Sequence, residues 1–379
     1  MSYNKLQSHA IYQHAKNIVL VCNHTAFDFD QKKYLFELIQ QDQKLYKIFT
    51  LEHGLFSDAQ DQVCINDTSF QEIPCISLYH KNIKDDFIST DIYADVDAIV
   101  MDIANVGARY YTFIAHKFRI LETTPSDIPI LLINRQNLIG NTVEGTILPA
   151  YLASILGVAG LIHRHGMNTY QLCQWYVKTN DNERNWPTII PIQITESKNS
   201  TLIAPSPNLP TSSSLSCYPG QCLWEATTWS EGRGTTQPFE LFGHPTLDWT
   251  NAQTIAKKFN KRFHFKAHIR VTTFTPTFHK HANQSCIGWQ LMILDHLQYP
   301  VVFGTIYLMR LCFEHMKDIP FWRMGSYEYD TSLTAADALI GDEELVKYIE
   351  GKISEQHVLE KMAIDRQKWI DIRSIYCSD

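Results

Sequence analysis

The sequence lacks any segment that is apolar for long enough to span a lipid bilayer, which takes about 20 consecutive apolar residues. The first ten residues, from Met1 to Ala10, also lack the apolar core of a secretory signal. We therefore expect neither a membrane partner nor export, and the predicted compartment is the cytoplasm.

Cysteine motifs and cofactor motifs are missing as well. The nine cysteines are scattered and form no Cys-x-x-Cys pair, and most lie in apolar runs, where a free cysteine behaves as a small buried hydrophobe. This pattern argues against a structural zinc site and is typical of a reducing compartment. Neither a Gly-x-Gly-x-x-Gly fingerprint nor a Walker lysine motif is present, so nucleotide binding is disfavoured and we expect no cofactor.

The balance of charge excludes another class of partner. The 33 basic and 40 acidic residues give a net charge of −7, which does not predict a nucleic-acid partner. Hydrophobic residues make up 45% of the chain, as in ordinary globular proteins, and 379 residues suffice for two domains. The oligomeric state is left open, a homo-oligomer included.

Four short apolar runs in the first 140 residues end abruptly in polar residues. They are 17–22 before Asn23-His24-Thr25, 47–51 before Glu52-His53-Gly54, 97–103 before Asn105 to Arg109, and 128–133 before Asn134-Arg135-Gln136-Asn137. Such runs are typical of buried parallel strands. Ligands of open α/β sheets bind beyond the carboxyl ends of the strands, so these clusters are predicted to converge on one active site.

The remaining pattern predicts two domains. Helices are expected over 30–43, with Asp28 or Asp30 as N-cap, over 110–123 and over 168–177, and a further strand over 188–195. The alternation predicts a doubly wound, mostly parallel Rossmann-like sheet in a catalytic domain over 1–245. Beyond it we expect a smaller α+β domain over 246–379 that closes the active-site cleft, with helices over 252–263, 301–316, 343–349 and 354–370 and strands over 269–274 and 286–294.

The segment from Pro205 to Gly243 differs in composition from the rest of the chain. Its five prolines and four glycines exclude long regular elements, yet it is too apolar for a linker, and long ordered loops are usually functional. It holds several polar residues that could bind a ligand or react: Ser206, Asn208, Glu225, Glu231, Arg233 and Glu240. The alternative is an internally salt-bridged loop that packs the domain interface, and the clustering favours function.

Glu52 is the strongest single candidate for chemistry. A carboxylate directly after a buried strand and near a glycine can act as a general acid, although a surface carboxylate that caps a turn is about equally consistent with the residues alone. Glu144 and Glu231 supply further carboxylates beside glycines. These three glutamates occur in a chain that lacks the spacing of a nucleophile–His–Asp triad. They therefore favour a reaction catalysed by carboxyl groups, as in glycoside hydrolysis.

Basic residues offer less specific signals. Arg109 suits bidentate binding of a carboxylate or phosphate, and its alternative is a structural ion pair, for instance with Asp102. His163 and His165 are two residues apart with no obvious third ligand, so a packing role is favoured over zinc. The His279-Lys280-His281 stretch is predicted to be a solvated loop.

Several of these motifs together resemble the NamZ-type exo-β-N-acetylmuramidases, a family long known only as a bacterial domain of unknown function. The matching segments are Asn23-His24-Thr25 with Glu52-His53-Gly54, 102–112, Val143-Glu144-Gly145, His165-Gly166-Met167, and 205–211 through 230–240. The resemblance covers nearly the whole chain. It implies a Rossmann-like first domain, a smaller second domain, and release of N-acetylmuramic acid from the non-reducing end of peptidoglycan fragments.

The resemblance suggests a catalytic role for Glu52, and the roles of the other residues are a hypothesis added to it. Glu52 matches the family's favoured catalytic glutamate, and we expect it to protonate the leaving oxygen, with Glu231 or else Glu144 as base or nucleophile. Arg109 or Arg233 would pair with the lactyl carboxylate, and Tyr111 and Trp229 would stack on the sugar. The expected substrate-binding residues are Asn23, His24, His53, Arg109, Tyr111, Asn134, Arg135, Asn137, His165, Asn208 and Arg233.

The chain departs from the family pattern at two aspartates. The family usually reads Gln-Asp-Val-Gly and Asp-Arg-Pro-Asn-Pro where this chain has Ala104-Asn105-Val106-Gly107 and Asn134-Arg135-Gln136-Asn137-Leu138. These amides support one alternative, a catalytically weakened protein that binds muramyl sugars as a sensor. A second alternative is a metal-dependent hydrolase that uses the histidine-rich segments.

Overall fold

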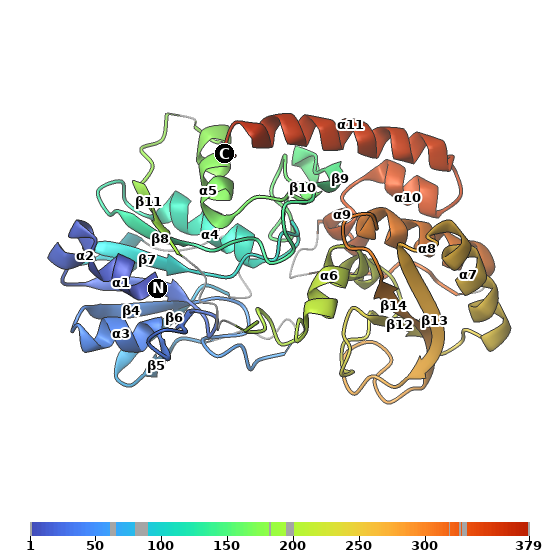
Figure 1. Cartoon of the computed structure of the whole chain (residues 1–379), viewed down its shortest axis with the longest axis horizontal. Coiled ribbons are helices and arrows are strands. Elements are labelled where there is room, and N and C mark those ends of the chain that lie inside the picture. The colour runs from blue at the N-terminus through green and yellow to red at the C-terminus, as the bar shows by residue number, and fades with distance from the viewer. Residues whose placement is uncertain are drawn as a thin grey trace.

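The first domain is built on a seven-stranded sheet, seen at the left of Figure 1. The computed structural model describes residues 2–60, 66–79, 90–181, 183–194, 201–317, 319–325, 327 and 332–377. In spatial order the strands are β11 (Ile189–Gln193), β8 (Ile130–Asn134), β7 (Ala98–Asp102), β1 (Ile18–Cys22), β4 (Leu45–Thr50), β6 (Ile73–Ser77) and β5 (Thr68–Phe70). Only the edge strand β5 is antiparallel to its neighbour.

The four strands predicted before polar clusters are confirmed as β1, β4, β7 and β8. Every residue of β1, β7 and β8 is buried, because strands in the middle of a sheet covered on both faces must be apolar throughout. The chain moves outward from β1 through β4 to β6, and from β7 through β8 to β11. The order therefore reverses between β1 and β7, and a ligand is expected at the carboxyl ends there.

The first domain has the helices α1 (Ser2–Gln7), α2 (Ala10–His14), α3 (Leu35–Gln41), α4 (Phe113–Thr123) and α5 (Thr169–Thr179). Helices α4 and α5 confirm the prediction, α3 starts later than expected, and α1 and α2 were not predicted. A hairpin of β2 (Phe27–Asp28) and β3 (Lys33–Tyr34) occupies the start of the helix expected over 30–43. Asp28 accepts the N–H groups of Tyr3, Asp30 and Gln31, so neither Asp28 nor Asp30 is the N-cap of α3.

Short elements after β8 lead toward the second domain. They are β9 (Glu144–Ile147), antiparallel to β10 (Ile162–Arg164), and the 3-10 turn η2 (Ala150–Leu152), whereas the 3-10 turn η1 (Thr90–Tyr93) precedes β7. The Pro205–Gly243 segment contains α6 (Ser212–Gln221) and the turn η3 (Cys222–Ala226), so the prediction of no long regular element was wrong there. The Thr211 hydroxyl caps α6 by accepting the Ser214 N–H, and Pro219 lies within the helix.

The second domain contains a three-stranded antiparallel sheet in the order β12 (Leu241–His244), β14 (Cys286–Ile293) and β13 (Ala267–Phe274). The helices are α7 (Trp249–Arg262), α8 (Val301–His315), α9 (Ala335–Leu339), α10 (Glu343–Ile349) and α11 (Glu355–Ser374). The architecture confirms the predicted fold class. The boundary after residue 245 stays a prediction, and the second sheet already begins at Leu241.

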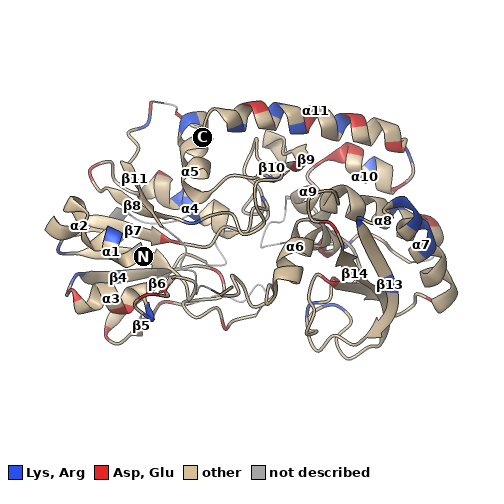
Figure 2. Ribbon diagram, viewed as in Figure 1, with Lys and Arg blue, Asp and Glu red and all other residues tan. Residues whose placement is uncertain are grey.

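The last helix connects the two domains. In Figure 1, α11 runs from above α10 back to α5, and Figure 2 shows that acidic and basic residues occur along its length. Its buried residues, Val358, Met362, Asp365 and Trp369, are three or four positions apart, so they share one face. The Trp369 indole donates to the His165 carbonyl at 2.8 Å. None of the helices in the described ranges is long and apolar enough to cross a membrane.

A buried carboxylate also joins the domains. Glu144 of β9 accepts the N–H groups of Val302 and Phe303 at 2.8 and 3.0 Å, and so caps the N-terminus of α8. Burial raises the pKa of Glu144 to about 7, although these N–H groups and the nearby Arg164 lower it. The folded protein therefore holds the Glu144 proton more tightly than the unfolded chain does.

We predict that Glu144→Gln alters how stability depends on pH. Because the Glu144 pKa rises from 4.5 to about 7 on folding, wild-type protein loses stability as pH increases through this window. Glutamine cannot ionise, so E144Q should gain up to about 3 kcal/mol relative to wild type between pH 5 and 8. Urea unfolding of both proteins at the two pH values measures this difference, and a difference that does not change with pH would contradict the assignment.

Candidate functional site

A pocket lies where the carboxyl ends of the strands meet the second domain. It encloses about 480 Å³, open solvent at its mouth included. Its walls come from the loops after β4 and β7, from Leu156, from the Pro205–Gly243 segment, and from Tyr327 and Leu339. The lining residues are Glu52, His53, Tyr110, Tyr111, Thr112, Phe113, Leu156, Ser206, Asn208, Leu209, Tyr218, Cys222, Glu225, Arg233, Phe239, Tyr327 and Leu339.

Glu52 forms one wall of this pocket. It follows β4 by two residues and is 8% exposed. The Thr112 hydroxyl donates to its Oε2 at 2.5 Å, and His53 Nε2 lies 3.9 Å from Oε1. His53 Nε2 also lies 3.4 Å from the Ser206 hydroxyl. The strand-end prediction thus placed Glu52 correctly at the pocket, in an orientation fixed by a residue from the next polar cluster.

Arg233 and Glu225 form the opposite wall. Glu225 Oε1 accepts from Arg233 Nη2 and Nε at 2.7 and 3.2 Å, and Glu225 Oε2 accepts a short hydrogen bond from the Tyr327 hydroxyl. The guanidinium also lies over the Phe239 ring, 5.2 Å from its centre. Burial alone would lower the pKa of Arg233, but Glu225 and Glu231 raise it, so the arginine is a permanent cation.

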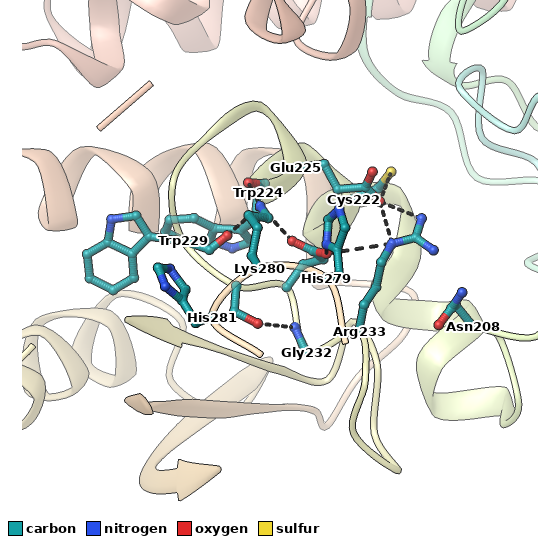
Figure 3. Close-up of polar contacts among 12 residues, drawn as sticks. Asn208, Cys222, Trp224, Glu225, Trp229, Gly232, Arg233, His279, Lys280 and His281 are labelled. Carbon is teal, nitrogen blue, oxygen red and sulfur yellow. Dashed lines mark hydrogen bonds and ion pairs between the residues drawn. The ribbon is translucent and has the colours of Figure 1, made fainter. Parts of the chain in front are cut away.

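Glu231 lies behind Arg233 and does not line the pocket. Its side chain is wholly buried, with Lys280 Nζ at 2.7 Å from Oε2, and His279 Nδ1 and Arg233 Nε at 3.1 and 3.6 Å from Oε1. Figure 3 shows Lys280, His279 and Arg233 side by side, with Glu225 next to the guanidinium. Burial raises the pKa of Glu231, but Lys280, His279 and Arg233 outweigh it and lower the pKa, so the carboxylate stays ionised.

The prediction that residues 279–281 are a solvated loop was wrong. Lys280 Nζ donates to the carbonyls of Trp224, Thr227 and Trp229 at 3.0, 3.1 and 2.5 Å. His281 Nε2 lies 2.7 Å from the Thr228 carbonyl oxygen. The sequence shows two histidines and a lysine among polar residues, but it does not show that a buried carboxylate and several carbonyls lie opposite them.

Two family models together match almost the whole chain. The N-terminal model of the exo-β-N-acetylmuramidase NamZ matches residues 18–213, and the C-terminal model matches residues 216–378. The chain belongs to the NamZ family. The resemblance inferred from the motifs is therefore confirmed.

A curated relative agrees with this membership. The chain is 31% identical over 327 residues to the peptidoglycan β-N-acetylmuramidase NamZ of Bacillus subtilis, a match that covers 83% of this chain and 77% of the relative. Crystal structures of two DUF1343 family proteins from Bacteroides fragilis superpose with TM-scores of 0.79 and 0.73. Their identities are 18% and 23%, with 99% of this chain and 95% and 97% of theirs covered, so they show the fold alone.

In this NamZ family member, the pocket gathers five of the predicted site residues. These are Glu52, His53, Tyr111, Asn208 and Arg233. The Tyr111 hydroxyl donates to the Pro205 carbonyl at 2.9 Å, and the Asn208 amide donates to Gln60 Oε1 at 3.1 Å. Both contacts hold the Pro205–Gly243 segment against the first domain.

Arg109 does not line the pocket. Its guanidinium is buried and donates to the carbonyls of Thr146, Leu339 and Ile340, at 2.9, 3.2 and 2.6 Å, with His163 Nε2 3.1 Å away. Burial lowers the pKa of Arg109 to about 10, which still leaves it charged at neutral pH. The expected ion pair with Asp102 is made by another residue, Arg135.

Arg135 forms a bidentate ion pair at the carboxyl end of β7. Its Nε and Nη2 donate to the two oxygens of Asp102 at 2.7 and 2.8 Å, and Nη2 also donates to the Thr25 carbonyl at 3.3 Å. Asn23 Oδ1 accepts from the Thr25 N–H and hydroxyl. The strand-end cluster therefore crosslinks the loops after β1, β7 and β8, at the point where the strand order reverses.

The remaining predicted residues also bond to the protein and lie outside the pocket. Asn134 Oδ1 accepts the Tyr170 N–H at the start of α5, and Asn137 Oδ1 accepts the Ile139 N–H. His24 Nε2 lies 2.8 Å from the Ala204 carbonyl, and burial lowers its pKa. His165 is buried and neutral, since burial lowers its pKa to about 3, and its Nδ1 accepts the Met167 N–H.

Sequence reasoning gave too little weight to three polar lining residues and misplaced one aromatic residue. Glu225 was included among the polar residues of its segment, but Glu231 was preferred as the second acid. Thr112 could not be distinguished from other hydroxyl residues, and no sequence feature pointed to Tyr327. Trp229, expected to stack on a sugar, is instead buried, and its ring stacks on Trp289. Within the part of the chain that the structure describes, no three His, Cys, Asp or Glu side chains are grouped so as to hold a metal ion.

We predict that Arg135→Gln destabilises the fold rather than weakening ligand binding. Asp102 is 1% exposed, and a buried carboxylate left without its cation costs about 3 kcal/mol. The double variant D102N/R135Q removes both charges and should recover part of that loss in urea unfolding. An R135Q protein with wild-type stability and weakened sugar binding would instead place Arg135 in the binding site.

Proposed function

We propose that this NamZ family member is an exo-acting β-N-acetylmuramidase that releases terminal N-acetylmuramic acid from peptidoglycan fragments. The observation that carries the proposal is Glu52, a buried carboxyl group whose orientation is fixed by Thr112 at the edge of the pocket. A general acid needs this combination, because it must meet the glycosidic oxygen in a fixed geometry, away from bulk water. The substrate is a muramyl disaccharide or a longer glycan fragment.

We propose Glu52 as the acid and Glu225 as the second carboxylate. Glycosidases generally use two carboxyl groups on either side of the scissile bond. Of the candidate acids, Glu52 and Glu225 line the pocket, whereas Glu144 caps α8 and Glu231 is ion-paired behind Arg233. Arg233 and Tyr327 both donate to Glu225, which favours its ionised form.

We propose Arg233 as the group that recognises the lactyl carboxylate of N-acetylmuramic acid. Arg109 has its guanidinium enclosed by carbonyls, whereas Arg233 lines the pocket with one edge held by Glu225. The planar guanidinium fork suits a carboxylate, and this charge distinguishes muramic acid from N-acetylglucosamine. Tyr111, with His53 and Asn208, would contact the sugar ring.

The wild-type protein should release para-nitrophenol from para-nitrophenyl β-N-acetylmuramic acid and not from the N-acetylglucosamine analogue. Glu52→Gln keeps the shape and the hydrogen-bonding capacity of the side chain but cannot donate the proton, so turnover should fall by about 100-fold or more while the melting temperature is retained. Wild-type rates in E52Q would remove Glu52 from the mechanism. Binding of muramic acid without any release by the wild type would favour the sensor, and loss of release with a chelator would favour a metal-dependent hydrolase.

We also propose that the protein works in the cytoplasm, on wall fragments that are being recycled. The eight cysteines in the described ranges are free thiols, and seven of them are buried, a usage typical of reducing compartments. Fractionation of cells that express the native chain should recover it with cytoplasmic markers. Recovery from the medium or the cell envelope would contradict this compartment.

A further inference from the structure

Lys280 lies one layer behind the pocket, where its ammonium group pairs with Glu231, the buried carboxylate that neighbours Arg233. We propose that Lys280 is a positioning residue that determines specificity: by cancelling the charge of Glu231, it leaves Arg233 able to attract the acidic sugar. The inference rests on the proposed role of Arg233 and adds a second cation to the recognition of the substrate.

The count of charges around Arg233 carries the argument. Glu225 and Glu231 lie 2.7 and 3.6 Å from its guanidinium nitrogens. His279 Nδ1, 3.1 Å from Glu231 Oε1, adds no charge when the imidazole is neutral. Without Lys280, the two carboxylates and one arginine would then leave an excess negative charge, which would repel an approaching carboxylate. Lys280 Nζ, 2.7 Å from Glu231, removes that excess. The positive charge of Arg233 is then balanced by the negative charge of Glu225 alone.

The geometry leaves one part of the arginine for a ligand. Nε and Nη2 both donate to Glu225, and Nε also faces Glu231. Nη1 donates to no group among the described residues, and Arg233 lines the pocket together with Asn208, which Figure 3 shows on the far side of the guanidinium from Lys280. The two carboxylates therefore hold the Arg233 guanidinium along one edge. The edge that carries Nη1 is left to donate to a ligand.

The ammonium group of Lys280 is fixed as firmly as the arginine. Three backbone carbonyls and Glu231 surround it, so it cannot follow a ligand into the pocket. Its loop is also interlocked with the 231–234 loop, since the Thr277 N–H donates to the Gly234 carbonyl at 2.9 Å. A Cβ atom at Gly234, where φ is +79°, would meet the Phe278 nitrogen at 2.7 Å, so only glycine allows this close approach.

A purely structural role for the Lys280–Glu231 pair makes a different prediction from an electrostatic one. If the pair only holds two loops together, loss of either partner should disturb the pocket in the same direction. If its charges act through Arg233, Lys280→Met and Glu231→Gln should have opposite effects on the affinity for an anion. The two effects should largely cancel in the double variant.

The experiment measures a preference for charge. Titration calorimetry compares N-acetylmuramic acid with its methyl ester, which has the same sugar and ether but no carboxylate, and the ratio of the ester Kd to the acid Kd reports the preference. We expect K280M to lower this ratio about tenfold and E231Q to raise it by a similar factor, with E231Q/K280M near wild type. Lys266→Met removes an exposed cation from the same domain and should leave the ratio unchanged.

The outcomes separate this inference from the proposed function. An unchanged ratio in E231Q, where Lys280 keeps its three carbonyl contacts, would overturn the role of the pair even if K280M does not fold. Equal shifts in K280M and K266M would show only a long-range effect of net charge and would also overturn it. A wild-type ratio near one would refute the Arg233 subsite itself. The assay for para-nitrophenol release tests the glycosidase independently of all three results.

Discussion

The burial of one guanidinium, that of Arg109, constrains the region behind the pocket. An arginine out of contact with water is tolerated only when its N–H groups find acceptors, and here these are the carbonyls of Thr146, Leu339 and Ile340. They belong to two segments, β9 and the end of α9, so the charge connects both domains. Gly341 has a φ of +59°, and a Cβ there would lie 2.5 Å from Arg109 Nη2, so the chain must turn away at a glycine.

The buried position of Arg109 also fixes the residues that follow it in the chain, and these line the pocket. Residues 110–113 follow Arg109 directly and line the pocket, and Thr112 among them donates to Glu52. Leu339, whose carbonyl accepts from Arg109, lines the same pocket from the second domain. The pocket is therefore enclosed by two domains whose relative position is fixed by buried charges, at Arg109 and at Glu144, and not by apolar packing alone. Fixed walls of this kind provide the preorganisation that acid catalysis requires.

The layout of the first domain could be predicted because it follows from simple physics. Continuous apolar runs must be central parallel strands, and parallel strands bring their carboxyl ends to one edge, so Glu52 could be assigned to a site without any structure. Which side chain of a cluster faces the ligand could not be predicted in the same way. Arg109 and Arg233 are both arginines near glycines, and only their surroundings, carbonyls in one case and a pocket in the other, separate them. Glu225 and Glu231 differ by six positions, and the turn η3 decides which of them reaches the pocket. Tyr327 and Lys280 arrive from the second domain, where no local pattern signals their partners.

The two amides that distinguish this chain from the family pattern show how a sequence difference at a motif can be structural. Asn105 Nδ2 donates to the Met167 carbonyl at 2.9 Å while its Oδ1 accepts the Gly107 N–H at 3.0 Å. Asn134 Nδ2 donates to Gln193 Oε1 and its Oδ1 accepts the Tyr170 N–H. Each amide uses a donor and an acceptor at once. Asn105 is wholly buried, and an ionised aspartate there would set a second acceptor against the Met167 carbonyl, with no hydrogen to share. Neither residue lines the pocket. The amides therefore bond to their own surroundings, and the carboxyl groups that face the pocket are those of Glu52 and Glu225.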